Sequence, residues 1–302
     1  MLPSTRASDF AELAPAASLA PSVARQRSAL RAVLSLPSGR VGATLTAVTL
    51  ATALLAPLLA TSDPFALAAA PLSPPTLAHL MGTDAIGRDV LSGVLYGARA
   101  SLLIAGSVTL LAFVCGAVVG MIAGWRGGLI DDLLMRVTEL LQVMPRFFLV
   151  VVAVALLGPG IDRMVITLGL TSWPVLARVV RGEVLAMREA DFVVAARASG
   201  ATAPRILWHE LLPNVMPSAA VLLGLLFGQI ILVEASLGFL GLGDPNAPSW
   251  GLLAGQAQGF VRVAWWLAVF PGLAIAVAVL GINLLADAWA AVLGGAATGV
   301  RT

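Results

Sequence analysis

Long apolar runs, separated by short polar segments, dominate this chain of 302 residues. A helix that spans a bilayer needs about 20 mostly apolar residues. Four charge-free runs meet that length, at 41–62, 100–125, 211–233 and 263–286. Two less regular stretches follow the second run, at 140–162 and 164–180, and the latter contains Pro174 and Arg178. Because backbone polar groups inside a bilayer must be satisfied within their own segment, the pattern predicts an all-α integral membrane protein with six transmembrane helices.

These runs divide the chain into five segments. We expect a cytoplasmic N-terminal tail at 1–40, a first anchor helix at 41–62, a periplasmic or interfacial segment at 63–98, a five-helix core at 99–293 that includes a polar cytoplasmic loop at 188–214, and a C-terminal tail at 294–302. A cleaved signal peptide is the alternative for the first run. That run is longer than a typical signal core and follows a long leader, so we favour an uncleaved anchor.

The arginines orient the spans. With the N-terminus inside, the cytoplasmic segments hold fourteen of the 18 basic residues, and the outer segments hold only Arg88, Arg99, Arg163 and Arg262. Cytoplasmic loops of membrane proteins carry the excess of positive charge, so this distribution predicts both termini in the cytoplasm. The same orientation places the polar loop at 188–214 in the cytoplasm.

Composition narrows the possible functions. The chain is 59% hydrophobic and 11% charged, whereas soluble domains carry about 25% charged residues. Its net charge of +2 does not indicate nucleic-acid binding. The sequence contains no Lys, which a phosphate-binding P-loop requires, so we expect no cofactor on this chain and assign ATP and Mg²⁺ to partner subunits. Cys115 is the single cysteine, and the two histidines lie far apart without a carboxylate cluster, so a metal site is not expected.

The polar segment 191–214 is unusual in so apolar a chain. The pattern predicts one helix over 188–199, a left-handed cap at Gly200, and a short second helix that Pro213 ends. A short helix exposed at the membrane surface is marginally stable alone, so docking into a soluble partner would stabilise it. An ordinary interfacial amphipathic loop is the alternative.

This segment resembles the coupling loop, or EAA loop, of binding-protein-dependent ABC importer permeases. The residues Ala195, Ala196, Gly200, Leu212 and Pro213 stand at that family's spacing. Two positions differ, since Val194 replaces the usual Glu and Glu210 replaces the usual Ile. The resemblance implies that the ATPase-coupling residues are Ala195, Ala196, Gly200, Glu210, Leu212 and Pro213. The two differences imply docking through helix shape and small residues instead of the usual carboxylate.

Four further stretches resemble the C-type permeases of oligopeptide, dipeptide and nickel importers. They are HLMGTDAIGRDVLSGVLYGARASL at 79–102, GWRGGLIDDLLMR at 124–136, SLGFLGLGDPNAPSWG at 236–251, and the last span at 265–289. The resemblance covers roughly residues 79–290 and implies the type I (MetI-like) importer architecture. In the first stretch we expect Asp84 to cap a helix that starts at Ala85 and to pair with Arg88, four residues on.

Two groups of residues are further candidates for transport roles. Gly241, Gly243, Pro248 and Trp250 form an outer turn that would act as a gate or docking turn, with a rigid helix-terminating turn as the alternative. Glu234, with Gln229 before it, is the clearest candidate for the passage lining, because a carboxylate at bilayer depth should face a cavity or a partner. A hydrogen bond between packed helices is the alternative for Glu234.

The resemblance implies a non-catalytic permease subunit in the bacterial inner membrane, forming half of a pathway for di- or oligopeptides or related small solutes. Its implied partners are a second homologous permease, two ATP-binding cassette subunits, an extracytoplasmic solute-binding protein and the lipid bilayer. An ion-coupled carrier is one alternative, for which Glu234 alone approaches the membrane centre. An intramembrane aspartyl protease at Asp244 is a remote one, because no second membrane Asp is placed to share a proton.

Overall fold

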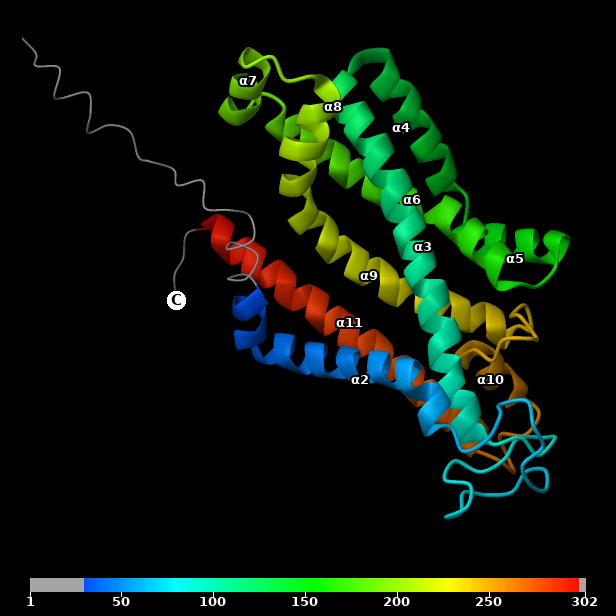
Figure 1. The fold of residues 1–302 in the computed structure, drawn as a ribbon. Helices are drawn as coiled ribbons and strands as arrows, with labels where there is room; N and C mark the ends of the chain where they lie inside the picture. The colour runs from blue at the N-terminus through cyan, green and yellow to red at the C-terminus, as the bar shows by residue number, and fades with distance from the viewer. Residues whose placement is uncertain (1–29, 299–302) are drawn as a thin grey trace, which may run out of the picture.

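The computed structural model describes residues 30–298 of the chain, and these fold almost entirely into helices (Figure 1). In chain order the elements are α2 (Pro37–Leu59), α3 (Val90–Arg126), α4 (Gly128–Val143), α5 (Arg146–Leu157), α6 (Ile161–Met187), α7 (Asp191–Ala198), α8 (Ala203–Ile206), the π-helical turn η2 (Leu207–Leu211), α9 (Leu212–Phe239), α10 (Trp250–Gln256) and α11 (Trp266–Thr298). We call the end with α7 and α8 the inner end, since the arginine distribution predicts that it faces the cytoplasm. The opposite end, with α10 and residues 60–89, is the outer end.

Five helices in the described residues are long and apolar enough to cross a membrane, and α4 with α5 makes a sixth span if this bent pair is counted as one. The two helices meet at 80°. The break falls at Met144, whose ψ of 129° is extended, because the ring of Pro145 excludes the helical conformation from the residue before it. With 12 residues, α5 alone reaches about 18 Å, too short for a bilayer. The prediction of six spans is therefore confirmed with a broken third span.

The helix ends differ from the sequence-based segments. The first span begins at Pro37, four residues early, because proline is well suited to the first helical turn. Helix α3 begins at Val90, inside the segment expected to be periplasmic, and α11 continues to Thr298 through much of the expected C-terminal tail. The rest of the two expected tails, residues 1–29 and 299–302, lies outside the described residues.

Glycines bring α3 and α6 into backbone contact. Gly116, Gly120 and Gly124 follow one another at four-residue spacing and lie on one face of α3. A Cβ atom at Gly120 would lie 2.5 Å from the carbonyl oxygen of Ala177, and one at Gly124 would lie 2.9 Å from that of Arg181. Small residues at this spacing allow close helix approach in membranes, where van der Waals packing holds helices together. The two helices therefore form one tightly packed pair.

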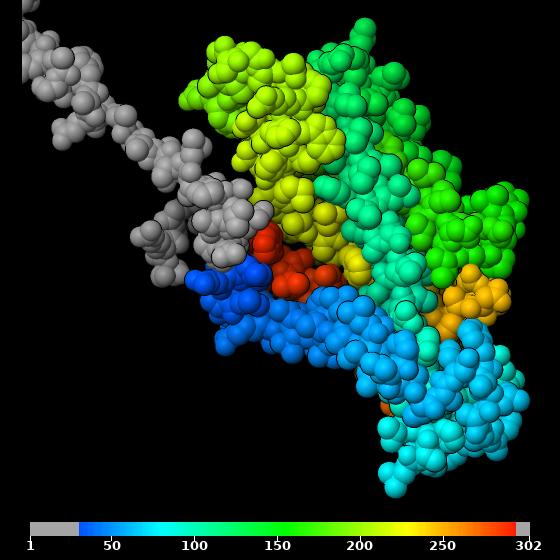
Figure 2. Space-filling view, in the orientation of Figure 1, coloured from blue at the N-terminus to red at the C-terminus, as the bar shows by residue number. Residues whose placement is uncertain are grey.

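Glycine also sets the packing of the first and last spans. A Cβ atom at Gly42 of α2 would lie 2.5 Å from the backbone nitrogen of Leu285, and one at Gly281 of α11 would lie 2.8 Å from the Cβ of Leu45. At the inner end this α2–α11 pair stands apart from α6 to α8, and α11 is visible at the back of the hollow between them (Figure 2). The buried apolar side chains accordingly form two clusters, one at the inner end around α6 to α9 and one along the outer half of the molecule.

Candidate functional site: the inner coupling segment and the outer cap

We call residues 188–214 the coupling segment. It contains a separate short helix instead of the expected helix over 188–199. Helix α6 ends at Met187, and α7 runs only from Asp191 to Ala198. The backbone turns between them because the N–H of Ala190 bonds to the carbonyl of Met187 at 3.0 Å, and Ala190 itself has an extended ψ of 151°. Three residues therefore connect α6 to α7, so any displacement of α7 acts directly on the end of a membrane-spanning helix.

Gly200 closes α7 as the sequence predicts. Its φ is +81°, and its N–H bonds to the carbonyl of Arg197 at 2.9 Å while the N–H of Ala201 bonds to that of Ala196 at 3.0 Å. These two bonds form the Schellman motif, which requires a left-handed residue that is most often glycine. Among the described residues, no group beyond the chain neighbours lies within 4 Å of a Cβ built on Gly200, so backbone conformation, and not space, demands glycine here.

The second helix of the segment does not end at Pro213, contrary to the prediction. Helix α8 continues through the π-helical turn η2 into α9, which has Pro213 in its first turn. A proline ring clashes with the preceding helical turn and has no N–H to donate. The wider π-helical turn directly before Leu212 relieves that conflict, so the chain passes from the coupling segment into the membrane without a break.

Apolar side chains anchor the coupling segment to the spans. Val193, Ile206 and Leu211 are buried in the inner cluster, together with Val180 and Val184 of α6. The segment also exposes large apolar side chains, with exposed fractions of 40% for Phe192, 52% for Val194 and 56% for Trp208. It is therefore anchored to its own chain by buried side chains and leaves three large apolar side chains open.

The sequence-predicted coupling residues lie on both sides of the Schellman turn. Ala195, Gly200 and Pro213 are exposed, whereas Ala196, Glu210 and Leu212 are half-buried. The guanidinium of Arg197 lies 4.4 Å from the centre of the Trp125 ring, a cation–π contact that fixes α7 to the end of α3.

A partly buried ion pair at the inner end is not evident from the sequence. Both Asp131 oxygens in α4 accept hydrogen bonds from the Arg181 guanidinium in α6, from Nε and from Nη2, the latter at 2.6 Å. This bidentate geometry is the strongest form of an arginine–carboxylate contact. The residues are 50 positions apart, so no local pattern reveals the pairing. The pair ties the first half of the broken span to the helix that leads into α7.

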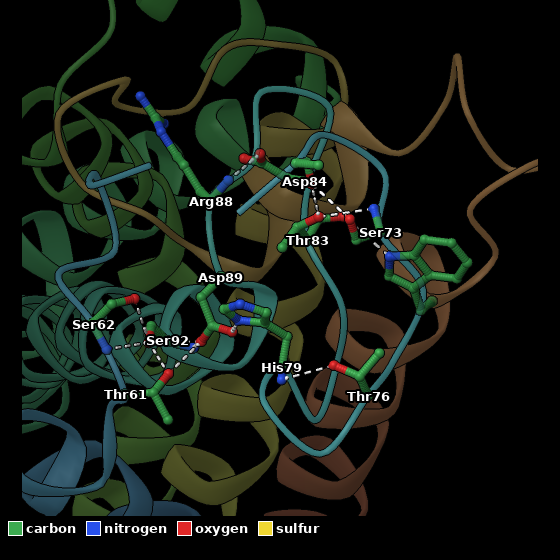
Figure 3. Close-up of polar contacts among 12 residues, drawn as sticks. Thr61, Ser62, Ser73, Thr76, His79, Thr83, Asp84, Arg88, Asp89 and Ser92 are labelled. Carbon is green, nitrogen blue, oxygen red and sulfur yellow. Dashed lines mark hydrogen bonds and ion pairs between the residues drawn. The ribbon is translucent and has the colours of Figure 1, made fainter. Parts of the chain in front are cut away.

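At the outer end, Asp89 and not Asp84 caps helix α3 (Figure 3). Asp84 accepts hydrogen bonds from the backbone N–H groups of Ile86 and Arg88 at 2.9 and 2.8 Å, so it closes a turn. Gly87 follows with φ at +91°, which stops a helix from starting at Ala85. The Arg88 side chain extends away from Asp84, so the expected pair does not form (Figure 3).

Asp89 is the centre of a hydrogen-bond network. Its Oδ2 accepts from the backbone N–H and hydroxyl of Ser92 and from the Thr61 hydroxyl, each at 2.8 Å, and its Oδ1 lies 3.1 Å from Nδ1 of His79 (Figure 3). Burial is the largest influence on its pKa and on its own raises it. The bonds from Ser92, Thr61 and His79 together lower the pKa of Asp89 below its ordinary value. The network joins the end of α2, the outer loop and α3.

The outer turn is held from within by tryptophan. Trp250 is 2% exposed and donates from Nε1 to the carbonyl of Val94 at 2.9 Å, so it anchors the turn and offers no surface to a partner. Pro248 is half-buried, Gly243 is buried, and Gly241 is exposed in the left-handed conformation with φ at +78°. The structure thus gives this turn a rigid inner side, and its role in gating or docking stays a prediction.

Glu234 and Gln229 do not share a surface. Glu234 is 1% exposed, and its Oε2 accepts from the Ser101 hydroxyl at 2.9 Å, whereas Gln229 is exposed. The Ser101 oxygen in turn accepts from the backbone N–H of Trp250 at 3.3 Å. In this structure Glu234 therefore links α9 to α3 and α10, which is the packing arrangement that the sequence left open, and a role in lining the passage stays a prediction.

Comparison with known proteins identifies the family. Residues 116–297 match the family model of the binding-protein-dependent transport system inner membrane component. A peptide transport system permease protein of Brucella suis (biovar 1, strain 1330) is 40% identical over 83% of this chain and 85% of its own length. A dipeptide transport system permease protein of Bacillus subtilis (strain 168) is 37% identical over 71% of this chain and 68% of its own length.

A solved structure shows the same fold. The match is to a chain of the MetNI methionine ABC transporter in an inward-facing conformation, with a TM-score of 0.54, 20% identity, and coverage of 66% of this chain and 96% of that one. The likeness confirms the expected type I importer architecture. Family and fold together establish a multi-pass inner-membrane transport component, without catalysis of its own, that works with ATPase and substrate-binding partners. The chain belongs to the inner-membrane permease components of binding-protein-dependent ABC importers.

Proposed function

We propose that this chain forms half of the translocation pathway of a peptide importer. The other half would come from a second homologous permease, and two ATP-binding cassette subunits would bind ATP and Mg²⁺ at the inner end. Support for the peptide cargo comes from the names of the relatives, which are peptide, dipeptide and di/tripeptide permeases. Related solutes such as nickel chelates or glutathione are the other candidates, and one relative is a glutathione permease.

The observation that carries the coupling role is the exposure of three large apolar side chains on the coupling segment. Phe192, Val194 and Trp208 are exposed on a segment that buried side chains anchor in the inner cluster. An exposed apolar surface rimmed by polar residues is typical of a protein interface. A groove on an ATPase subunit would cover these side chains, and Val194 in place of a carboxylate makes that contact apolar.

The connections of the segment explain how such docking would move the spans. A displacement of α7 reaches α6 through three residues, and the glycine contacts carry it from α6 to α3. The same displacement reaches α9 through α8 and η2, which form a continuous helical path. Closure of the ATPases on ATP would thus swing α3, α6 and α9 together and open the pathway outward, and hydrolysis would reset it.

The two alternative functions do not agree with the family. Asp244 closes a turn by accepting from the backbone N–H of Asn246 at 2.9 Å. The protease reading also requires two carboxylates that share a proton. Glu234, the one candidate for an ion-coupled relay, bonds to Ser101 inside the helix packing.

The coupling role is tested by Gly200→Val, with Gly272→Val as the matched control. Gly272 also has open space around a built Cβ, but it lies within α11 and has no left-handed φ. A β-branched side chain at Gly200 opposes the left-handed conformation and distorts the Schellman turn. We expect uptake of a labelled dipeptide into proteoliposomes to be abolished by Gly200→Val and retained by Gly272→Val.

Membrane insertion and recovery of the ATPase subunits, measured after mild detergent extraction, separate the possible outcomes. Normal uptake by Gly200→Val would remove the coupling role. Uptake of a nickel chelate but of no peptide by the wild-type complex would leave coupling intact and overturn the cargo.

A further inference from the structure

A cavity of about 290 Å³ lies at the outer end, beside the turn between α9 and α10. Its walls come from the outer loop, the start of α3, α10 and the first turns of α11. Most of the lining is apolar and includes Phe65, Ile86, Leu253, Phe260 and Pro271. Three charged side chains also line it, Asp84, Arg88 and Asp89.

The two carboxylates already have partners. Asp84 accepts from two backbone N–H groups, and Asp89 is the centre of the network with Ser92, Thr61 and His79. Their hydrogen bonds come from the outer loop and the start of α3, so both carboxylates are needed to hold the cavity wall in place. Asp84 accepts both of its bonds at Oδ1, and Asp89 uses both of its oxygens.

Arg88 differs from both carboxylates. Its guanidinium lies 5.4 Å from the centre of the Phe65 ring, which holds the side chain over an apolar surface. Its Nε is buried without a hydrogen-bond partner in the described residues, and no carboxylate of those residues lies within salt-bridge distance. A buried polar group without a partner costs about 1–3 kcal/mol, and more when it is charged. The cavity therefore holds a half-buried guanidinium that forms no salt bridge with the two carboxylates beside it.

We propose that this cavity receives an acidic side chain, with an apolar neighbour, from the extracytoplasmic solute-binding protein when it docks. The carboxylate pairs with Arg88 and the apolar neighbour packs against Phe65 and the α10 side of the cavity. A guanidinium held on an aromatic ring is preorganised for a bidentate carboxylate contact. The inference rests on the proposed function, since it assigns a site to one partner of the importer.

The size and place of the cavity favour a docked protein over the transported solute. Pockets for small molecules usually enclose about 300–1,000 Å³, and this one is at the lower limit, enough for one or two side chains and too small for an oligopeptide. It is bordered by Pro245 and Pro248 of the outer turn, at the end of the molecule where a binding protein arrives. A single anchor in a desolvated pocket is the usual form of an interaction hot spot.

The test compares Arg88→Gln with Arg99→Gln in the full transporter, reconstituted in nanodiscs. Arg99 is another outer arginine and lies in α3. It also lies over an aromatic ring, that of Tyr96 at 5.9 Å, but it is exposed and outside the cavity. The separately purified solute-binding protein of the importer is titrated onto each variant. We expect Arg88→Gln to raise the dissociation constant about ten-fold or more, with weaker salt dependence, and Arg99→Gln to leave it unchanged.

Uptake in proteoliposomes distinguishes the other outcomes. At saturating binding protein, Arg88→Gln should reach the wild-type maximal rate, because docking and not the passage is altered. An unchanged dissociation constant overturns the proposal. A fall in maximal rate at unchanged docking would assign the cavity to the solute. An uptake rate that depends on anionic lipid in the wild type but not in Arg88→Gln would assign it to a phospholipid. Failure of the wild type to take up any solute would instead overturn the proposed function.

Discussion

The coupling segment and the outer end of this permease are stabilised by different contacts. The outer end is joined by side-chain hydrogen bonds, with Asp89 connecting three segments and the indoles of Trp250 and Trp266 donating to the carbonyls of Val94 and Thr83. The coupling segment relies mainly on apolar anchors and one backbone turn, with the cation–π contact of Arg197 and Trp125 beside them. Hydrogen bonds fix geometry, whereas apolar contacts tolerate sliding.

This difference fits the function that we propose for each end. We expect the coupling segment to move with an ATPase subunit and to keep its shape, and a Schellman turn preserves local shape. We expect the outer end to present a constant surface to a docking partner, and a buried polar network would provide one.

Removing the centre of the outer network should have the largest effect on stability. Asp89→Ala leaves Ser92 and Thr61 without their acceptor, and we expect a loss of about 3–5 kcal/mol. The thermal unfolding midpoint in detergent measures it. Asp63→Ala in the same loop is the control, because Asp63 accepts only from the exposed backbone N–H of Phe65. Equal midpoints for the two variants would show that the network does not stabilise the cap.

Acid should weaken the same network in a defined window. The folded-state pKa of Asp89 is lowered, so its carboxylate stabilises the fold at pH values above the unfolded pKa of about 3.9. That contribution declines as the pH falls below about 4 and is lost as the pH passes through the folded pKa. In Asp89→Asn the corresponding decline of the unfolding midpoint should disappear. An identical acid profile in both proteins would assign the decline to other groups.

The ion pair between α4 and α6 should rank second. Asp131 is buried, but about a third of the Arg181 side chain is exposed, so Asp131→Ala should cost about 1–3 kcal/mol. The exposed neighbour Asp132 supplies the control, and Asp132→Ala should change stability by less than about 0.5 kcal/mol. The double exchange Asp131→Arg with Arg181→Asp should recover part of the loss. No recovery in denaturant-unfolding measurements would mean that the pair acts through packing alone.

The contrast between the ends also explains which features the sequence could predict. The bilayer fixes the length of an apolar run that spans it, so the six spans and their order were predictable. Gly200 was predictable because a left-handed turn has a recognisable residue. Both depend on the chain near the residue in question, and both are confirmed.

Tertiary partners were not predictable in this way. Asp84 and Asp89 are both suitable helix caps by type. The left-handed conformation of Gly87, which lies against the Ala69 carbonyl, decides between them. The contact between Glu234 and Ser101 joins residues 133 positions apart. The turn sequence around Trp250 does not indicate that its ring is buried. One sequence without tertiary contacts offers no signal for such pairings.

A smaller effect is expected where one outer hydrogen bond is removed and the packing is retained. Trp250→Phe keeps an aromatic ring in the buried site but deletes the donor to the Val94 carbonyl. We expect a cost of about 1–2 kcal/mol, from the lost bond and the smaller ring. Trp265→Phe, at an exposed tryptophan, should cost less in the same unfolding assay. A cost for Trp250→Phe no larger than for Trp265→Phe would show that the turn does not depend on this bond.

The smallest effect on stability should come from the exposed apolar side chains of the coupling segment, where the effect on assembly should be clear. Phe192→Ser replaces an exposed apolar side chain, so the free energy of unfolding of the isolated permease should change by less than about 0.5 kcal/mol. Recovery of ATPase subunits in mild detergent should fall, because the docked state loses apolar contact. Val193→Ser, at the adjacent buried position, is the comparison. It should lower the free energy of unfolding of the isolated chain, because it buries a hydroxyl in an apolar cluster. If Phe192→Ser destabilised the isolated permease as much as Val193→Ser, the exposed side chain would belong to the fold and not to a partner.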